Sequence, residues 1–284
     1  LVITPIRHIL GVSKTLESIG EVSYFDDPTP TEVVSVIGDY DAIFTNPNKS
    51  KVFIGKEVLD AATKLKVICT ASTGTNHIDK PYVAQLGLPI LSLTEERKVI
   101  NRISSTAELA FALTLVGLRH VVKGHLSVMN GEWDYTQFIG RQMNCLTIGV
   151  IGYGRLGSMY AKFCKAFDSR VLVYDPYKLV EDKEIEQYDS LESMLKISDV
   201  VAIHVHVTDE TLGMVNKNCF DNMKQDALLV NTARGDIVNE KDLINFLENN
   251  DHAKVATDVL EDEVRNRMKS PLLEYALRSD QVIV

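Results

Sequence analysis

The stretch from Thr147 to Asp175 constrains the fold of this chain more than any other. It consists of an apolar strand, a glycine turn, a helical run and a second apolar strand that ends in a carboxylate. Gly152 permits the sharp turn, Gly154 lets a pyrophosphate approach the backbone, and Gly157 lets the helix pack closely on the strand. The N-terminus of that helix offers free N–H groups and a partial positive charge. This pattern predicts a dinucleotide-binding β–α–β unit.

The acidic residue at the end of the second strand indicates which dinucleotide is bound. Asp175 lies about 20 residues beyond the glycine turn, where a carboxylate can accept hydrogen bonds from both ribose hydroxyls. Its charge would repel a 2′-phosphate, which favours NAD over NADP. A glycine-rich surface turn is the alternative, but the flanking strand, helix and carboxylate favour a dinucleotide site.

Composition excludes several classes of partner. A length of 284 residues suggests two domains, and 45% hydrophobic with 24% charged residues is typical of a globular protein. The net charge of −9 argues against binding to nucleic acid or an anionic membrane. The four cysteines are scattered, which favours reduced thiols in a cytoplasmic protein. We expect no metal site, and no membrane span, because no apolar run approaches the ~20 residues required.

Residues 1 to about 100 alternate short apolar strands with helical runs, which predicts a parallel sheet covered on both faces. The expected strands cover residues 1–3, 22–25, 42–45, 66–70 and 89–93. This part lacks the glycine fingerprint, so it should not carry the dinucleotide. Residues 101–129 are predicted to form one long connecting helix. For Trp133, the only tryptophan, a buried packing role is favoured over stacking on a ligand.

Beyond the fingerprint, further strands are expected at 200–204, 227–232, 255–259 and 281–284, with helical runs between them. Their continuous apolar character is typical of strands buried on both faces. The chain begins in a strand-like segment without an initiator methionine and ends in another. We therefore expect it to be part of a longer protein.

Two loops at the carboxyl ends of these strands carry candidate chemical groups, because ligands of open parallel sheets bind there. Arg234 follows the strand at 227–232, and an acidic run from Asp258 to Glu263 follows the next strand. An arginine can grip a carboxylate with two N–H groups and leave another for the adjacent carbonyl oxygen. A glutamate there would suit a histidine, whose basicity it would raise. A surface cap and a solvated acidic loop are the alternatives, but the pairing on adjacent loops favours function.

These motifs, together with Ser72–Asp79 and Thr106–Glu108, resemble the D-isomer-specific 2-hydroxyacid dehydrogenases, and look closest to the phosphoglycerate dehydrogenase branch. The resemblance spans nearly the whole chain. It implies an α/β protein with two doubly wound parallel-sheet domains and a cleft between them. The first is a flavodoxin-like substrate-binding domain (1–100, completed beyond residue 284), and the second a Rossmann NAD-binding domain (101–284). It also implies a homodimer that acts as an NAD-dependent oxidoreductase on the CH–OH group of a small 2-hydroxy or 2-keto acid.

The resemblance also assigns roles to individual residues. It makes Arg234 the clamp for the substrate carboxylate and carbonyl, and Glu263 the partner of a catalytic histidine. That histidine belongs to a Thr-Pro-His run just after the strand at 281–284. Gly74, Thr75 and Asn76 form a loop whose backbone N–H groups hold the substrate carboxylate. The positions that match NAD contacts are Thr73, Thr106, Gly152, Gly154, Arg155, Leu156, Gly157, Asp175, Val205, His206, Thr232, Ala233, Arg234 and Asp258.

Some positions depart from the family pattern. Residues 45–48 and Thr70 lie where phosphoglycerate enzymes tend to carry phosphate-binding arginines, which argues against 3-phosphoglycerate as substrate. Thr73 replaces a lysine of the phosphite-oxidising relatives, and His206 replaces a proline beside the cofactor. The alternative function is an NADH-sensing interaction protein of the co-repressor type, without dehydrogenase turnover. The negative net charge and the retained Arg234 and Glu263 favour the enzyme.

Overall fold

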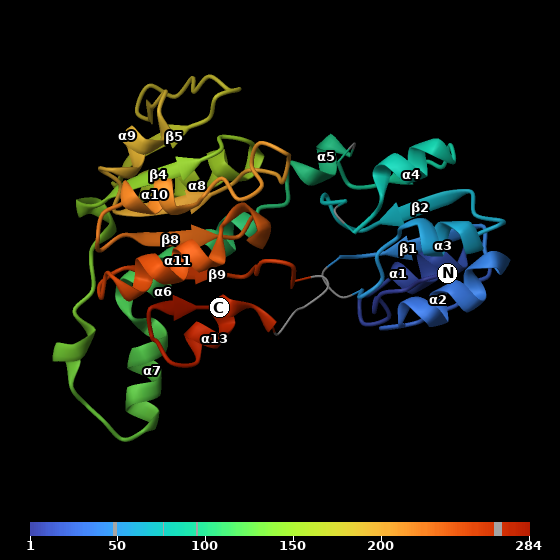
Figure 1. The fold of residues 1–284 in the computed structure, drawn as a ribbon, viewed down its shortest axis with the longest axis horizontal. Helices are drawn as coiled ribbons and strands as arrows, with labels where there is room; N and C mark the ends of the chain where they lie inside the picture. Colours follow the sequence, from blue (N-terminus) through green and yellow to red (C-terminus); the bar gives the residue numbers. More distant parts are fainter. Residues whose placement is uncertain (48–49, 76, 95, 264–268) are drawn as a thin grey trace. The chain divides into compact units, whose positions relative to one another are not determined.

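The computed structural model of this chain describes residues 1–47, 50–75, 77–94, 96–263 and 269–284. These residues form two compact units, Leu1–Arg102 and Ile103–Val284 (Figure 1). Each unit is a parallel β-sheet with helices packed on it, which confirms the predicted α/β class. The predicted cleft between two domains stays a prediction.

The first unit contains a parallel sheet in the order β1 (Ala42–Thr45), β2 (Val67–Thr70) and β3 (Ile90–Leu91). The strands expected at 1–3 and 22–25 are reduced to isolated bridges, in which Val2 lies parallel to both Tyr24 and Phe44. These bridges extend the spatial order to 22–25, 1–3, β1, β2, β3. That is the flavodoxin-like order 2-1-3-4-5, as expected for this part of the chain.

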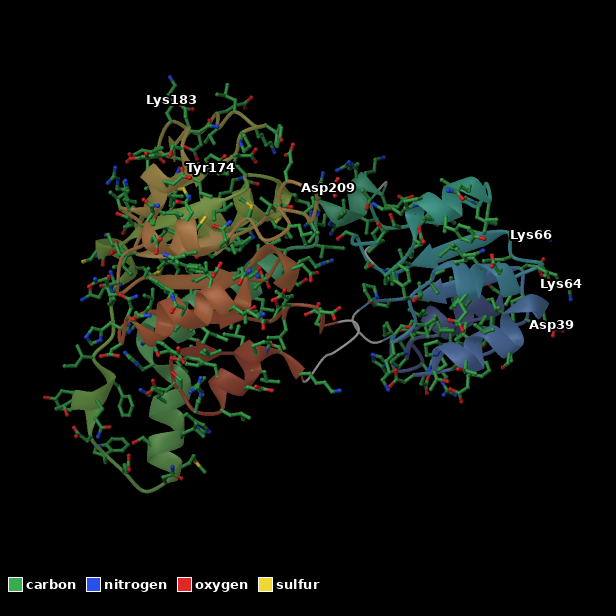
Figure 2. The ribbon with its side chains drawn as sticks, in the orientation of Figure 1. Asp39, Lys64, Lys66, Tyr174, Lys183 and Asp209 are labelled. Atoms are coloured by element: carbon green, nitrogen blue, oxygen red, sulfur yellow. The ribbon has the colours of Figure 1, made fainter. Side chains whose placement is uncertain are left out.

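Helices separate the strands of the first unit, as the alternation of apolar strands with helical runs predicted. The second of them starts at a capping box, in which Thr29 Oγ1 accepts the Glu32 N–H at 3.3 Å and Glu32 accepts the Thr29 N–H at 2.8 Å. Charged side chains such as Lys64 and Asp39, paired at 3.2 Å, project outward from this unit (Figure 2). The helices are α1 (Val12–Glu17), α2 (Pro30–Val36), α3 (Lys56–Ala61), α4 (Lys80–Gln85) and α5 (Arg97–Ile100), with a short 3₁₀ turn η1 (Ile37–Asp39).

The second unit is built on a seven-stranded parallel sheet in the order β10-β9-β8-β7-β4-β5-β6. The strand order reverses between β4 and β7, as in Rossmann folds, and ligands bind at such switch points. The strands are β4 (Thr147–Ile151), β5 (Arg170–Tyr174), β6 (Glu186–Gln187), β7 (Val200–Ile203), β8 (Leu228–Asn231), β9 (Lys254–Thr257) and β10 (Val282–Ile283).

The central strands of this sheet are buried on both faces, as their apolar runs predicted. Val200 and Ala202 belong to one core cluster, while Val201 and Ile203 belong to another. Helices therefore cover both faces (Figure 1). They are α6 (Ser105–Arg119), α7 (Val121–Met129), α8 (Arg155–Ala166), α9 (Leu191–Leu195), α10 (Lys217–Asp221), α11 (Glu240–Glu248) and α13 (Pro271–Ala276), with 3₁₀ turns η2 (Tyr135–Phe138), η3 (Met143–Cys145) and η4 (Gly235–Ile237).

Two expectations for residues 101–133 are wrong. The single long helix is interrupted at His120, whose φ of 53° is left-handed and separates α6 from α7. Trp133 is 90% exposed rather than buried. The helical pattern continues across His120, but a single left-handed residue turns the chain away from the sheet, so the segment beyond α6 does not reach the core (Figure 1).

The segment Arg97–Arg119 has the length and mean hydropathy of a membrane span, although charged residues interrupt its apolar run. Most of this segment is α6, which packs against α8, β8 and β9. α6 buries Ala107, Ala110 and Thr114 against the sheet. A Cβ at Gly117 would lie 2.9 Å from Leu228, so the absence of a side chain permits the close approach. This apolar helix is therefore a core helix of the second unit.

Candidate functional site

The carboxyl ends of five strands of the second unit lie in register. Ile151 of β4 pairs with Tyr174 of β5 and with Ile203 of β7, and the row continues through Asn231 of β8 to Thr257 of β9. The residue after each of these therefore lies at one edge of the sheet. Those residues are Asp175, Gly152, His204, Thr232 and Asp258.

The three glycines of the turn after β4 have different surroundings. Gly152 has a φ of 90°, and a Cβ there would lie 2.6 Å from Val205. A Cβ at Gly157 would lie 2.0 Å from the Gly152 carbonyl oxygen. A Cβ at Gly154 would meet nothing within 4 Å, so the backbone there is open to a ligand. Gly152 and Gly157 thus permit close packing of the turn, while Gly154 leaves its backbone accessible. This combination fits a diphosphate.

The carboxylate of Asp175 is hydrogen-bonded to the backbone of this turn. Its Oδ2 accepts the N–H of Tyr153 at 2.8 Å, and its Oδ1 accepts the N–H of Tyr177 at 2.9 Å. Each oxygen has a further lone pair for a ribose hydroxyl. No basic side chain among the described residues forms an ion pair with Asp175, so its charge would oppose an added phosphate.

His204 packs beneath the glycine turn. Its ring lies 5.0 Å from that of Tyr160, and its Nε2 is buried without a hydrogen-bond partner. Burial lowers the pKa of His204 to about 4, which keeps the imidazole neutral. These contacts indicate a packing role for His204. His206, by contrast, is exposed.

The loop after β8 is shaped by a side chain that the sequence did not single out. Asn231 Oδ1 accepts the Ala233 N–H at 3.0 Å, and its Nδ2 donates to the Arg234 carbonyl at 2.8 Å. The Thr232 hydroxyl in this loop is buried without a partner, which suits a ligand contact. Arg234 donates from Nη1 to the Ala233 carbonyl and forms no ion pair within the described part of the chain. Its guanidinium retains donors for an incoming carboxylate.

The loop after β9 holds carboxyls in a buried setting. Burial raises the pKa of Glu263, and the nearby Asp258 and Asp236 charges add to this effect, while the Leu260 N–H and the Arg234 charge oppose it. Burial likewise raises the pKa of Asp258, against its own backbone N–H and the charge of Arg234. Clustered carboxyls with raised pKa values beside an arginine are typical of functional sites.

The remaining predicted residues lie on two separate units. Thr73, Gly74 and Thr75 follow β2 in the first unit, where Ser72 donates to the Gly74 carbonyl at 2.6 Å. Asn76 lies outside the described residues. In the second unit, Thr106 lies in the first turn of α6, and Arg155 and Leu156 lie in the first turn of α8.

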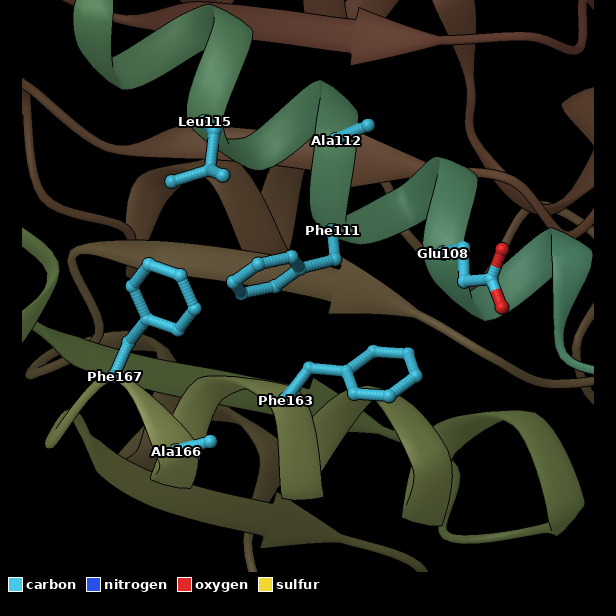
Figure 3. Close-up of a pocket in the computed structure, with 7 residues that line it drawn as sticks. All are labelled: Glu108, Phe111, Ala112, Leu115, Phe163, Ala166 and Phe167. Carbon is cyan, nitrogen blue, oxygen red and sulfur yellow. The ribbon is translucent and has the colours of Figure 1, made fainter.

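A hollow of about 300 Å³ lies between α6 and α8, away from the predicted site residues (Figure 3). Phe111 lies at its centre, with ring centroids 5.9 Å from Phe163 and 4.9 Å from Phe167. Glu108 is the charged residue of its lining. An apolar hollow bordered by a carboxylate does not fit a diphosphate, which requires N–H donors.

Comparison with known proteins agrees with this arrangement. Residues 111–284 match the family described as D-isomer specific 2-hydroxyacid dehydrogenase, NAD binding domain. The chain belongs to this family. The predicted family and the predicted fold class are therefore confirmed, and the matched residues 111–284 all lie in the second unit.

The relatives that this chain resembles carry the names of several different enzymes. The chain is 32% identical over 253 residues to a D-3-phosphoglycerate dehydrogenase of Methanocaldococcus jannaschii, covering 88% of this chain and 47% of the relative. It is 34% identical over 241 residues to a glyoxylate reductase of Pyrococcus furiosus, covering 82% and 69%. Among solved structures it resembles a D-lactate dehydrogenase of Aquifex aeolicus with NAD and lactic acid, with a TM-score of 0.82, 27% identity, and coverage of 99% and 86%. The chain spans about half the length of the phosphoglycerate dehydrogenases it matches.

Proposed function

We propose that the protein is an NAD-dependent D-2-hydroxyacid dehydrogenase acting on a small 2-hydroxy or 2-keto acid. One observation carries the proposal. The loops of Arg234 and Glu263 follow adjacent strands at the same sheet edge as the glycine turn. This edge therefore offers a guanidinium for a carboxylate, a carboxyl with a raised pKa and a backbone open to a diphosphate.

The proposed roles follow from the chemistry of each group. Bound NAD supplies or accepts the hydride at substrate C2. Arg234 orients the substrate carboxylate and stabilises negative charge on the C2 oxygen. Glu263 raises the basicity of a histidine that exchanges the hydroxyl proton, at the position where the family carries it beyond residue 284. The Gly74–Asn76 loop holds the carboxylate through backbone N–H groups. Along the cofactor, Gly154, Arg155 and Leu156 contact the pyrophosphate.

The direct test is a screen of the full-length protein against a panel of 2-keto acids with NADH, followed by the loss of NADH absorbance. Reduction of at least one keto acid is expected, with NADH preferred to NADPH. Tight NADH binding without turnover of any keto acid would instead favour an NADH-sensing interaction protein.

The preference for NAD should depend on Asp175. In Asp175→Ala the ribose hydroxyls of NADH lose a hydrogen-bond acceptor, and the 2′-phosphate of NADPH is no longer repelled by a carboxylate. We expect the ratio of kcat/KM with NADH to that with NADPH to fall by about tenfold or more, the scale of one or two charged hydrogen bonds. Asp189→Ala, at an exposed carboxylate of the same unit, is the control. An unchanged ratio in Asp175→Ala would reject the ribose role.

We propose that the protein forms a homodimer through residues 121–139, here called the apolar arm. The arm comprises α7 and the segment after it, and α7 extends from α6 away from the strands of the second unit (Figure 1). Its exposed apolar side chains are Val121, Val122, Leu126, Val128, Met129, Trp133, Tyr135 and Ile139. A segment that exposes this many large apolar side chains is typical of an interaction site. A second copy suits it, because the same unit also presents the apolar hollow between α6 and α8, and a twofold dimer repeats each contact.

The dimer is tested by light scattering after size-exclusion chromatography. The wild type should have the mass of a dimer, and Leu126→Glu together with Trp133→Glu should give monomers. Leu277→Glu changes an exposed leucine outside the arm and should stay dimeric. A monomeric wild type, or dimeric arm variants, would contradict the assignment.

We also propose a cytoplasmic location. Cys69, Cys145, Cys164 and Cys219 are all free thiols, as expected in a reducing compartment. Cell fractionation with an antibody to the native protein tests this, and recovery in a secreted fraction would contradict it.

A further inference from the structure

Glu240 is a buried carboxylate beside the loop that carries Glu263. It is the first residue of α11, and only 2% of its surface is exposed. Its Oε1 accepts the N–H of Glu261 at 2.8 Å. Its Oε2 accepts the Ser270 hydroxyl at 2.7 Å and the N–H of Leu272 at 3.2 Å. No basic side chain of the described residues forms an ion pair with it, so these three donors stabilise its charge.

The bond to Glu261 reaches into the turn that holds Glu263. Within that turn, Glu263 accepts the Leu260 N–H at 2.9 Å, and its own N–H donates to the Leu260 carbonyl at 3.3 Å. Leu260 and Glu263 thus bond to each other within the turn, and the bond from the Glu261 N–H to Glu240 joins the turn to α11. The position of the Glu263 carboxyl therefore depends on Glu240.

The same turn touches the segment after Arg234 at two further points. A Cβ at Gly235 would lie 1.9 Å from the Leu260 carbonyl carbon, so the two backbones are in direct contact. Asp236 Oδ1 accepts the N–H of Asp262 at 3.2 Å. The loops of Arg234 and Glu263 are thus fastened together by Gly235, Asp236 and Glu240, none of which is among the predicted site residues.

A purely stabilising role does not account well for a carboxylate in this position. Removing a charge from water is costly, and a buried charge is weak evidence for stability. The carboxylate of Glu240 has two acceptor oxygens, whereas a glutamine of the same size has one acceptor oxygen and one NH₂ donor group. One oxygen of Glu240 meets the Glu263 turn and the other meets the start of α13. The carboxylate is suited to setting geometry.

We propose that Glu240 is a positioning residue for the dehydrogenase reaction. It holds the turn of Glu263 against the Arg234 segment, and so sets the distance between the guanidinium that binds the substrate and the carboxyl that supports the proton-exchanging histidine. This role rests on the proposed function.

The test compares Glu240→Gln with Ser270→Ala in the full-length protein. The glutamine keeps the size of the side chain but has a single acceptor oxygen. That oxygen meets two donors when it faces Ser270 and Leu272, so the NH₂ group faces the Glu261 N–H, which loses its acceptor. Ser270→Ala removes a donor on the α13 side only and leaves that bond intact. We expect Glu240→Gln to lower kcat by about tenfold or more, because small displacements of catalytic groups have effects of that size. The Kd for NADH should stay within about twofold, and Ser270→Ala should keep kcat within about twofold.

Thermal unfolding and hydrogen exchange separate positioning from stability. Exchange in the peptide covering residues 257–263 should be faster in Glu240→Gln than in both the wild type and Ser270→Ala. If Glu240→Gln keeps wild-type kcat, or if both variants lose kcat in proportion to their loss of Tm, the proposal is overturned. If Glu240→Gln does not fold, Glu240→Asp keeps the charge on a shorter side chain, and a wild-type kcat in that variant would also overturn it.

The exchange measurement also distinguishes this proposal from the proposed function. A wild type that reduces no keto acid would contradict the dehydrogenase assignment, while exchange at 257–263 would still report whether Glu240 holds the turn. An active wild type with unchanged exchange in Glu240→Gln would contradict the positioning role alone.

Discussion

Replacing Arg234 by alanine is expected to lower kcat/KM for a 2-keto acid by about 100-fold or more, the effect of removing one donor to a developing oxyanion. Arg234 forms no ion pair in the described structure, and Nη1 donates only to the Ala233 carbonyl. Its remaining donors are thus available to the substrate. Steady-state kinetics of the full-length protein at saturating NADH measure the change.

The controls for Arg234→Ala separate catalysis from folding. Arg278→Ala removes an arginine of the same unit whose exposed partner is Glu248, and it should leave kcat/KM within about twofold. Arg234→Lys keeps the charge but loses the planar fork of donors, so only part of the activity should return. Near-normal turnover in Arg234→Ala would show that another residue binds the carboxylate.

Alanine at Gly154 is expected to weaken NADH binding without loss of stability, whereas alanine at Gly157 is expected to destabilise the fold. At Gly154 the new methyl group meets open space in the protein, so the fold should be retained. It would occupy the face that a pyrophosphate approaches, and the Kd for NADH should rise by about tenfold or more. At Gly157 the methyl group would lie 2.0 Å from the Gly152 carbonyl oxygen. That overlap should cost about 1–3 kcal/mol of the free energy of unfolding, or more.

Titration with NADH and thermal unfolding of both variants distinguish the two effects. Gly154→Ala should keep a Tm close to that of the wild type, and Gly157→Ala should lower it clearly. Gly20→Ala, in the first unit, adds a methyl group in open space away from the turn and the apolar arm, and it controls for a general effect of alanine. Normal NADH binding in Gly154→Ala would refute the pyrophosphate contact.

Local patterns predicted the elements of the second unit well. The apolar runs at 200–204 and 227–232 correspond to β7 and β8, and the fingerprint corresponds to β4, α8 and β5. Each of these signals is encoded within a few consecutive residues. The prediction of one helix over 101–129 was wrong because helical periodicity does not report the left-handed conformation of His120. The same turn of the chain leaves Trp133 exposed, although a large apolar side chain favours burial.

The sequence alone determined the α/β class, the dinucleotide fingerprint with Asp175, and the family, because these depend on residue type at fixed spacing. Only the tertiary structure decided which side chains hold the loops of Arg234 and Glu263 in place. Asn231, Asp236 and Glu240 act through hydrogen bonds from their side chains to backbone N–H or carbonyl groups. For Asp236 and Glu240 the partners lie more than twenty residues away in the chain. Such partners come together only when parallel strands align their carboxyl ends, so no local sequence pattern predicts these hydrogen bonds.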